Sequence, residues 1–320
     1  MNRFDLIIPG KFFLLGEFSV LERFPAIVGT IGRYTKISYH EQSQSRHIIC
    51  KYGKKTESFF IDNKDSEIAK YLAQNLNDKK NFELVIDSNE MFSKDQKLGL
   101  GSSASVASGI IELINILNGS DFSLQSKINL AKDFHNTMQQ AQGSGADIAG
   151  IFYGGATLIA QSGCSKISML DKYRDHFRVI TTPAAKNTTH AIRQFQSWAN
   201  ESDKNKSLLT QMGNTTNAAV DAINQSNLLG FIGKISEFSE LLKRLEMSSG
   251  IEIFTTHHQE IERIAAEYNV AYKPCGGGGD IGFMAALDPK IFTELEPKLN
   301  SLGKVLKSDL FVKGISDLLA

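Results

Sequence analysis

Cysteine is scarce in this chain of 320 residues. There are three, Cys50, Cys164 and Cys275, and they lie far apart. No pair has the C-x-x-C spacing of a zinc or redox site, and an odd number of scattered thiols does not build a disulfide framework. The cysteine pattern therefore argues against a disulfide-stapled or zinc-stapled fold and favours a reducing compartment.

An excess of charge of one sign is also missing. Lysine plus arginine and aspartate plus glutamate each number 35, so the formal net charge is zero. Proteins whose main partner is a nucleic acid or an anionic membrane carry a basic excess. We therefore expect no nucleic-acid partner and no membrane partner. A basic pocket for a phosphorylated ligand would be local.

Long apolar runs are absent as well. None approaches the ~20 residues that a membrane-spanning helix needs. The first residues, Met1 to Asp5, lead almost directly into a strand-like stretch, and no signal peptide is visible. We expect an unprocessed cytoplasmic protein. A chain of 320 residues is long enough for one large or two medium domains, each with its own core.

The order of local patterns predicts an α+β protein and not a doubly wound parallel sheet. We place a domain boundary near residue 182, which gives an N-terminal domain at 1–182 and a C-terminal domain at 183–320. The patterns predict strands at 6–15 (broken by a Pro-Gly turn), 26–39, 47–61, 82–86, 156–160, 177–182, 281–287 and 304–312, and helices at 66–76, 104–117, 124–140, 208–245, 257–268 and 290–302.

The segment from Lys97 to Ser105 has the composition of a phosphate-binding loop. Gly99 and Gly101 let the backbone turn tightly and approach a ligand closely. The serines that follow can cap a helix, and the free N–H groups and dipole at a helix start attract anions. The Gly-Lys-Ser/Thr ending of a Walker loop is missing. The alternative is an ordinary turn before a capped helix.

A second glycine segment surrounds one carboxylate. Small residues flank Asp147 between Gln142 and Ala149, and an apolar run follows. A carboxylate on a sterically open loop can orient an attacking group or accept its proton. The alternative is that Asp147 caps the next helix.

A third segment, Lys273 to Asp280, contains four consecutive glycines. Such a run is costly to order, so close approach to a ligand or to another backbone is its best explanation. The alternative is a flexible hairpin tip. No neighbour in the sequence activates Cys275 as a nucleophile, and we interpret it as a loop residue.

A fourth segment, Pro9 to Glu17, places Lys11 at the start of an apolar strand. Lys11 is either a solvated residue at a strand end or a cation for a carboxylate or phosphate.

In this order and at this spacing, the four segments resemble the superfamily of galactokinase, homoserine kinase, mevalonate kinase and phosphomevalonate kinase, the GHMP kinases. The resemblance extends from Pro9 to Gly282. It implies a two-domain α+β fold, with an N-terminal half like domain 2 of ribosomal protein S5 and a ferredoxin-like C-terminal half. It also implies an active site between the halves, with ATP and Mg²⁺ as cofactors.

Within the superfamily, the chain is most similar to phosphomevalonate kinase. Phe18 follows Gly-Glu where mevalonate kinase has histidine, Lys97 opens the second motif, and the segment from Gly143 to Ala149 matches Gly-Ser-Gly-x-Asp-x-Ala. His135 and Gln139 also fall at the family's spacing before the aspartate.

One position separates the chain from mevalonate kinase, and two segments depart from the family's patterns. Asn136 stands where mevalonate kinase has a magnesium-binding glutamate. The glycine motif ending at Asp280 is one residue shorter than usual and has Cys275 in place of serine. Pro183 stands where a glycine is usual, in a stretch that touches substrate in the family.

The resemblance assigns roles residue by residue. Lys11 would lie beside the attacking oxygen and the γ-phosphate, and Asp147 would orient the attacking group or accept its proton. Ser103 would be the protein ligand of magnesium. The nucleotide phosphates would contact Lys97, Gly99, Leu100, Gly101, Ser102, Ser103 and Ala104, and the substrate would contact Glu17, Ser144, Gly145, Lys186, Arg193, Gly276, Gly277 and Gly278.

The expected reaction is ATP-dependent phosphorylation of 5-phosphomevalonate in isoprenoid-precursor synthesis by the mevalonate pathway. A phosphate acceptor has a second pKa near ~6, so it needs no strong base at neutral pH. One alternative is a mevalonate kinase, whose hydroxyl acceptor would need Asp147 as a base. Another is a catalytically silent relative that only binds nucleotide. The form of the Lys11 motif disfavours a decarboxylase of the same superfamily.

Overall fold

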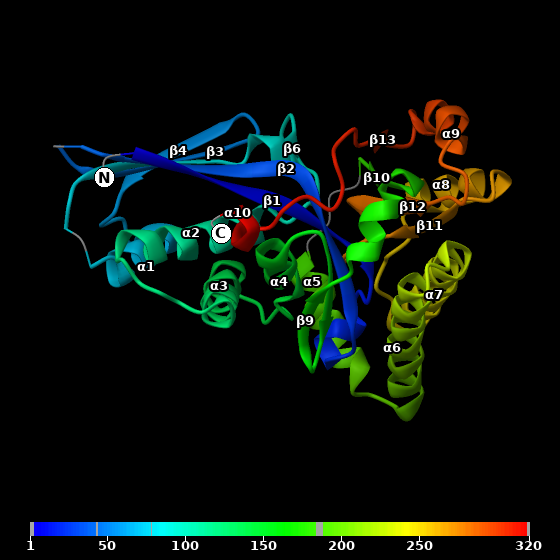
Figure 1. The fold of residues 1–320 in the computed structure, drawn as a ribbon. Coiled ribbons are helices and arrows are strands. Elements are labelled where there is room, and N and C mark those ends of the chain that lie inside the picture. Colours follow the sequence, from blue (N-terminus) through cyan, green and yellow to red (C-terminus); the bar gives the residue numbers. More distant parts are fainter. Residues whose placement is uncertain (1–2, 43, 78, 184–187, 319–320) are drawn as a thin grey trace.

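The computed structural model describes residues 3–42, 44–77, 79–183 and 188–318. Its strands form a seven-stranded sheet, a four-stranded sheet and a two-stranded hairpin (Figure 1). In the larger sheet the strand order is β4-β3-β5-β2-β8-β9, and β1 pairs with β2. Its strands are β1 Arg3–Leu15, β2 Ala26–Glu41, β3 Arg46–Tyr52, β4 Lys55–Phe60, β5 Phe82–Asp87, β8 Ala156–Ala160 and β9 Gly163–Lys166.

Strand β1 is continuous, although the sequence predicted two short strands separated by a Pro-Gly turn. It pairs antiparallel with β2 along its length, with a register shift between Pro9 and Gly10. A proline lacks the N–H that a ladder position requires, and a bulge is a place where a strand tolerates it. The bulge therefore absorbs Pro9 without ending the strand, and Lys11 stays on the same rigid element as the core residues.

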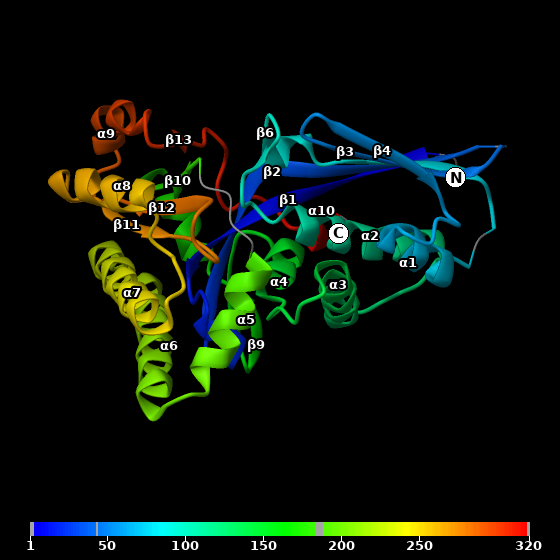
Figure 2. The same cartoon turned by 180° about the vertical axis from the view of Figure 1, so that it is seen from behind.

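Helices cover one face of the larger sheet (Figures 1 and 2). Gly109 and Gly150 permit close packing there, because a Cβ at either position would lie 2.5 Å from a side-chain carbon of Ile37 or Val28. These helices are α1 Glu67–Asn75, α2 Ser102–Leu117, α3 Leu124–Gln139 and α4 Ala146–Tyr153, and the short elements of this half are η1 Ser19–Glu22, η2 Asn89–Met91, β6 Phe92–Ser93 and β7 Gln96–Lys97.

The four-stranded sheet has the order β11-β12-β10-β13 and carries helices on both faces. Side chains alternate along β12: Phe283 joins the core formed with α6 and α7, and Met284 joins the core formed with α8 and α9. The elements are η3 Ser168–His176, β10 Phe177–Thr181, α5 Thr188–Ala199, α6 Asp203–Asn224, α7 Leu228–Ser249, α8 Thr256–Glu267, β11 Ala271–Pro274, β12 Ile281–Ala285, α9 Ile291–Leu299 and β13 Lys304–Val305.

Two expected elements differ in extent. The helical pattern at 208–245 is two helices, because the chain turns after α6 and Asn227 caps α7 by accepting a hydrogen bond from the Gly230 amide at 2.8 Å. The strand expected at 304–312 is short. After β13, Leu310 and Lys313 form only isolated bridges to the N-terminal half.

The two halves meet through a shared core. The ring of Phe12 on β1 stacks on Phe283 of β12 with centroids 5.7 Å apart. The chain end returns to the first half, where α10 (Ile315–Leu318) packs against α4 and β1. The α+β arrangement expected from the sequence is confirmed.

The division into two domains at residue 182 remains a prediction. The sheets change between β9 and β10, so β10 already pairs in the second sheet although it precedes residue 182. None of the helices in the described ranges is both long and apolar enough to cross a membrane.

Candidate active site

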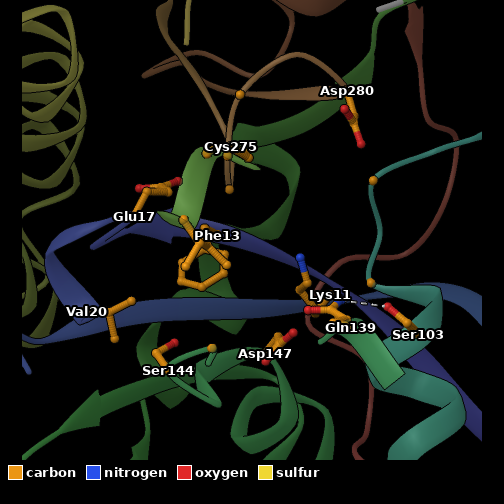
Figure 3. A pocket seen from close by; sticks show the side chains of 18 of the residues that line it. Lys11, Phe13, Glu17, Val20, Ser103, Gln139, Ser144, Asp147, Cys275 and Asp280 are labelled. Carbon is orange, nitrogen blue, oxygen red and sulfur yellow. Dashed lines mark hydrogen bonds between the residues drawn. The ribbon is translucent and has the colours of Figure 1, made fainter. Parts of the chain in front are cut away.

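A cleft of about 540 Å³ contains residues from all four glycine-marked segments (Figure 3). This volume is within the range usual for small-molecule sites. Figure 3 shows Cys275 and Asp280 on the side of the cleft opposite to Ser144 and Asp147. Of the residues that the resemblance assigned, the following line it: Lys11, Glu17, Lys97, Gly99, Gly101, Ser103, Ser144, Asp147, Gly276, Gly277 and Gly278.

The loop before α2 presents a helix start to the cleft. Gly101 is the N-cap of α2, has a φ of 80°, and provides no side-chain cap for the first-turn N–H groups. A Cβ at Gly101 would lie 2.7 Å from Cε of Lys11 and would displace that side chain, and the positive φ of Gly101 itself favours glycine. The Lys11 amide donates to the Leu100 carbonyl at 2.8 Å, and the Ser105 hydroxyl donates to the Pro9 carbonyl at 2.9 Å. These bonds fix the loop to β1.

The hydroxyl of Ser103 is oriented by two side chains of α3. Gln139 Nε2 donates to it at 3.2 Å, and His135 Nε2 lies 3.2 Å away. Burial lowers the pKa of His135, with the nearby cations Lys11 and Lys97 acting in the same direction and Asp147 opposing them. A neutral His135 can accept the hydroxyl proton, which leaves one Ser103 lone pair open to the cleft.

Two lysines converge on the loop. The Lys11 amine lies 5.4 Å from the ring centre of Phe13, which is two positions along on the same face of β1. Lys97 is exposed and lines the cleft, and the surrounding protein and the like charge of Lys11 lower its pKa, while Asp280 opposes this. Paired cations of this kind attract an anionic ligand.

Asp147 lies in the first turn of α4, and the N-cap of that helix is Gly145. The alternative interpretation of Asp147 as the N-cap is therefore wrong. Its Oδ1 accepts a hydrogen bond from the Ile148 amide at 2.9 Å. Its Oδ2 lies 3.8 Å from Nδ1 of His135, which is too long for a hydrogen bond. The carboxylate is thus available to a ligand in the cleft.

Glu17 forms an ion pair with Lys273 that joins the two halves. Both side chains are buried, at 1% and 0% exposure, and Lys273 also donates to the Pro274 carbonyl at 2.9 Å. The second carboxylate oxygen of Glu17 has no hydrogen-bond partner within the part of the chain that the structure describes. Glu17 therefore has one oxygen paired with Lys273 and a second oxygen that is buried without a partner among the described residues.

The glycine loop after β11 closes the opposite side of the cleft. A Cβ at Gly99 would lie 2.6 Å from Cβ of Asp280, so the two loops touch. Burial raises the pKa of the Cys275 thiol to about 12. Cys275 is thus a neutral buried thiol in the cleft wall.

Several residues assigned from the sequence do not line the cleft. Leu100, Ser102 and Ala104 are buried, and Ser102 lines a neighbouring cavity instead. Gly145 is the cap of α4 beside Lys132. The Arg193 side chain is exposed and donates to the Gln140 carbonyl at 3.3 Å. Lys186 lies outside the described residues.

The cleft also contains residues that the sequence did not single out. Phe13 was accessible to sequence reasoning, because it shares a strand face with Lys11. The other side chains reach the cleft through tertiary packing, which no local pattern records. They form an apolar wall made of Val20, Leu21, Met138, Ala191 and Ile192. Phe18 and Asp280, which lie in segments that the sequence did single out, also line the cleft.

Comparison with known proteins gives a consistent result. Residues 63–155 match the family model described as GHMP kinases N terminal domain. A sequence search of curated proteins gives no match.

Solved structures resemble this fold over nearly its full length. A Lin0012 protein from Listeria innocua has a TM-score of 0.81 at 21% identity, covering 97% of this chain and 98% of that one. Phosphomevalonate kinase of Streptococcus pneumoniae, in complex with phosphomevalonate and AMPPNP, has a TM-score of 0.79 at 19% identity, covering 96% and 99%. Mevalonate kinase of Methanococcus jannaschii has a TM-score of 0.72 at 19% identity, covering 97% of each chain.

The fold is that of a GHMP kinase, with a glycine-serine loop at a helix start and a cleft between two sheets. Residues 63–155 of the chain match the GHMP kinase N-terminal family model, and its fold is similar over nearly the whole length to those of mevalonate and phosphomevalonate kinases of known structure.

Proposed function

We propose that this protein transfers the γ-phosphate of ATP to a small acceptor that already carries a phosphate, most specifically 5-phosphomevalonate. The observation that carries this proposal is the convergence of Lys11, Lys97, the Ser103 helix start and Asp147 on one cleft. Phosphoryl transfer requires alignment of the reactants and neutralisation of negative charge, and this group of residues supplies both.

ATP would extend across Ser103, with its phosphates in the cleft and its adenine ring in a neighbouring cavity. Its phosphates would lie against the N–H groups at the start of α2. A second cavity of about 320 Å³ shares Ser103 and Met138 with the cleft. Its lining includes Ile86, Phe92 and Val106. An apolar pocket next to a phosphate loop suits a nucleotide base, so we assign the adenine ring to it.

Magnesium would reach the site with the nucleotide. No cluster of three metal-binding side chains occurs in the residues that the structure describes. Mg²⁺ needs none, because it keeps several waters and binds substrate phosphates with one or two protein oxygens. The lone pair left on Ser103 fits that requirement, and the ion would neutralise phosphate charge.

The reaction would proceed by in-line displacement. An oxygen of the acceptor forms a bond to the γ-phosphorus as the bond to the β–γ bridging oxygen breaks, and ADP leaves with the electron pair. Lys11, held over Gly101, would neutralise the charge on the transferring group. Asp147 would orient the acceptor and accept a proton if the acceptor carries one.

Lys11 and Lys97 could bind a phosphorylated acceptor, in a cleft that Glu17, Asp147 and Asp280 also line. Two lysines face a cleft in which the nucleotide phosphates would already be held by a helix start. An acceptor phosphate is largely deprotonated at neutral pH and attacks without a strong base. The similarity to a phosphomevalonate kinase solved with phosphomevalonate supports the specific acceptor. A mevalonate hydroxyl is the alternative.

The test is a panel of acceptors assayed for ADP release with MgATP. We expect fastest turnover with 5-phosphomevalonate. Equal or faster turnover of mevalonate would contradict the acceptor and support the alternative. No turnover of either, with ATP binding intact by calorimetry, would contradict the enzymatic proposal and favour a silent nucleotide-binding protein.

A further inference from the structure

His258 lies behind the glycine loop and does not line the cleft. It is fully buried, in the first turn of α8, where Thr255 caps the helix by accepting a hydrogen bond from the His258 amide at 3.4 Å. A buried imidazole that takes no part in the site already described needs a different explanation. Its contacts give one.

The hydrogen bonds of His258 define the proton on its ring. The Gly279 amide donates to Nε2 at 3.2 Å, so this nitrogen carries no proton. In the neutral ring the proton is therefore on Nδ1, which is hydrogen-bonded to the hydroxyl of Tyr272. Burial raises the pKa of Tyr272 well above its ordinary value, so the phenol stays neutral. The pair thus fixes one tautomer, with its acceptor turned toward the loop.

The glycine loop is held by protein contacts at its C-terminal end, from Gly278 to Asp280, and has open space around Gly276. The Gly279 carbonyl accepts from the Thr182 hydroxyl, and the Asp280 carbonyl accepts from the Thr182 amide at 2.8 Å. A Cβ at Gly278 would lie 2.6 Å from the Ile253 carbonyl oxygen, whereas a Cβ at Gly276 would meet nothing within 4 Å. Residues 276–278 line the cleft. The backbone that faces the ligand is therefore anchored through Gly279.

We propose that His258 is a positioning residue that holds the glycine loop in the conformation that receives the acceptor substrate. Four glycines lose much conformational freedom when they are ordered. A buried imidazole acceptor at Gly279, opposite the Thr182 contact, offsets that loss at the position next to the cleft. The link to the acceptor rests on the proposed function, whereas the anchoring of the loop does not.

The test compares three variants and has two measurements. His258→Leu removes the acceptor, and His258→Gln restores an oxygen acceptor of similar reach. His257→Leu is the control, because His257 is the adjacent, only partly buried histidine of α8. Hydrogen–deuterium exchange by mass spectrometry follows the loop, and steady-state kinetics follows the KM of each substrate.

We expect His258→Leu to speed exchange at residues 275–280 about tenfold and to raise the acceptor KM about tenfold. The kcat and the KM for ATP should stay within about threefold. His258→Gln should recover most of both changes, and His257→Leu should resemble the wild type.

Unchanged loop exchange in a folded His258→Leu protein would overturn the proposal, as would faster exchange with an unchanged acceptor KM. If His258→Leu does not fold, Tyr272→Phe replaces it. Without the phenol oxygen, the Nδ1–H of His258 loses its hydrogen-bond partner. The tautomer that accepts from the Gly279 amide is then less favoured, and hydrogen exchange in the loop should become faster. No rise would overturn the proposal. If the wild type has no kinase activity, the proposed function is contradicted. The exchange measurement would still test whether His258 anchors the glycine loop.

Discussion

At the scale of single residues, Lys11 is the side chain with the most direct role in the proposed chemistry. Its amine lies in the cleft and its carbon chain lies over Gly101. Lys11→Met keeps the packing and removes the charge. We expect kcat to fall by at least ~10²-fold, since one lost electrostatic donor costs about 3 kcal/mol in the transition state. ATP affinity should stay within a few-fold.

Asp147→Asn is the matched comparison, because it changes the other polar group while the amide can still accept the Ile148 hydrogen bond. Its effect on kcat should be smaller than that of Lys11→Met if the acceptor is a phosphate, and larger if the acceptor is a hydroxyl. Near-wild-type kcat in a folded Lys11→Met protein would show that Lys11 is not catalytic.

His135 makes stability depend on pH. Its pKa in the folded protein is lowered from 6.5, chiefly by burial. Between 6.5 and that lower value the unfolded chain binds a proton that the folded protein does not. The free energy of unfolding should therefore fall as pH drops through this window and be unaffected by His135 above it.

Urea unfolding of the wild type and of His135→Gln, measured across the same pH series, isolates this contribution. Glutamine keeps a polar contact to Ser103 but does not titrate. The decrease in the free energy of unfolding below pH 6.5 should be smaller in His135→Gln than in the wild type. His257→Gln serves as the control. An identical pH dependence in wild type and His135→Gln would contradict this account of the buried histidine.

At the scale of elements, the ion pair of Glu17 and Lys273 joins the turn after β1 to β11. Removing one partner leaves the other charge buried and alone, which typically costs 3–5 kcal/mol. We expect Glu17→Gln and Lys273→Met each to lower the free energy of unfolding by about that amount. The double variant should be more stable than the sum of the single losses implies.

Urea unfolding of both single variants and the double variant measures the coupling as a double-mutant cycle. Losses below about 1 kcal/mol in both single variants would mean that the pair is not the link between the halves.

Elements with strong local signals could be predicted from the sequence, and those defined by distant contacts could not. α2 follows from its apolar stretch after a glycine-serine start, and β2 from its β-branched residues. The continuity of β1 through Pro9 depends on pairing with β2, which no local pattern gives. The segment after β13 reads as a strand because it is apolar, but its residues instead pack between the two halves.

At the scale of the whole molecule, the site depends on segments that are distant in the sequence. Resemblance to a family identified Lys11, Ser103, Asp147 and the glycine loop as a group, and the fold places them around one cleft. The apolar wall depends on how η1, α3 and α5 pack, and the support of the loop by His258 depends on how α8 packs, so both required the structure.

The most direct test of the central claim is ³¹P NMR of the protein with MgATP and 5-phosphomevalonate. The account predicts that the single phosphomonoester resonance is replaced by the two coupled resonances of a diphosphate, in step with the appearance of ADP. Lys11→Met should slow this conversion by at least ~10²-fold. Persistence of the monoester, with mevalonate converted to a phosphomonoester in a parallel sample, would contradict the claim. So would hydrolysis of ATP to free phosphate with neither acceptor changed.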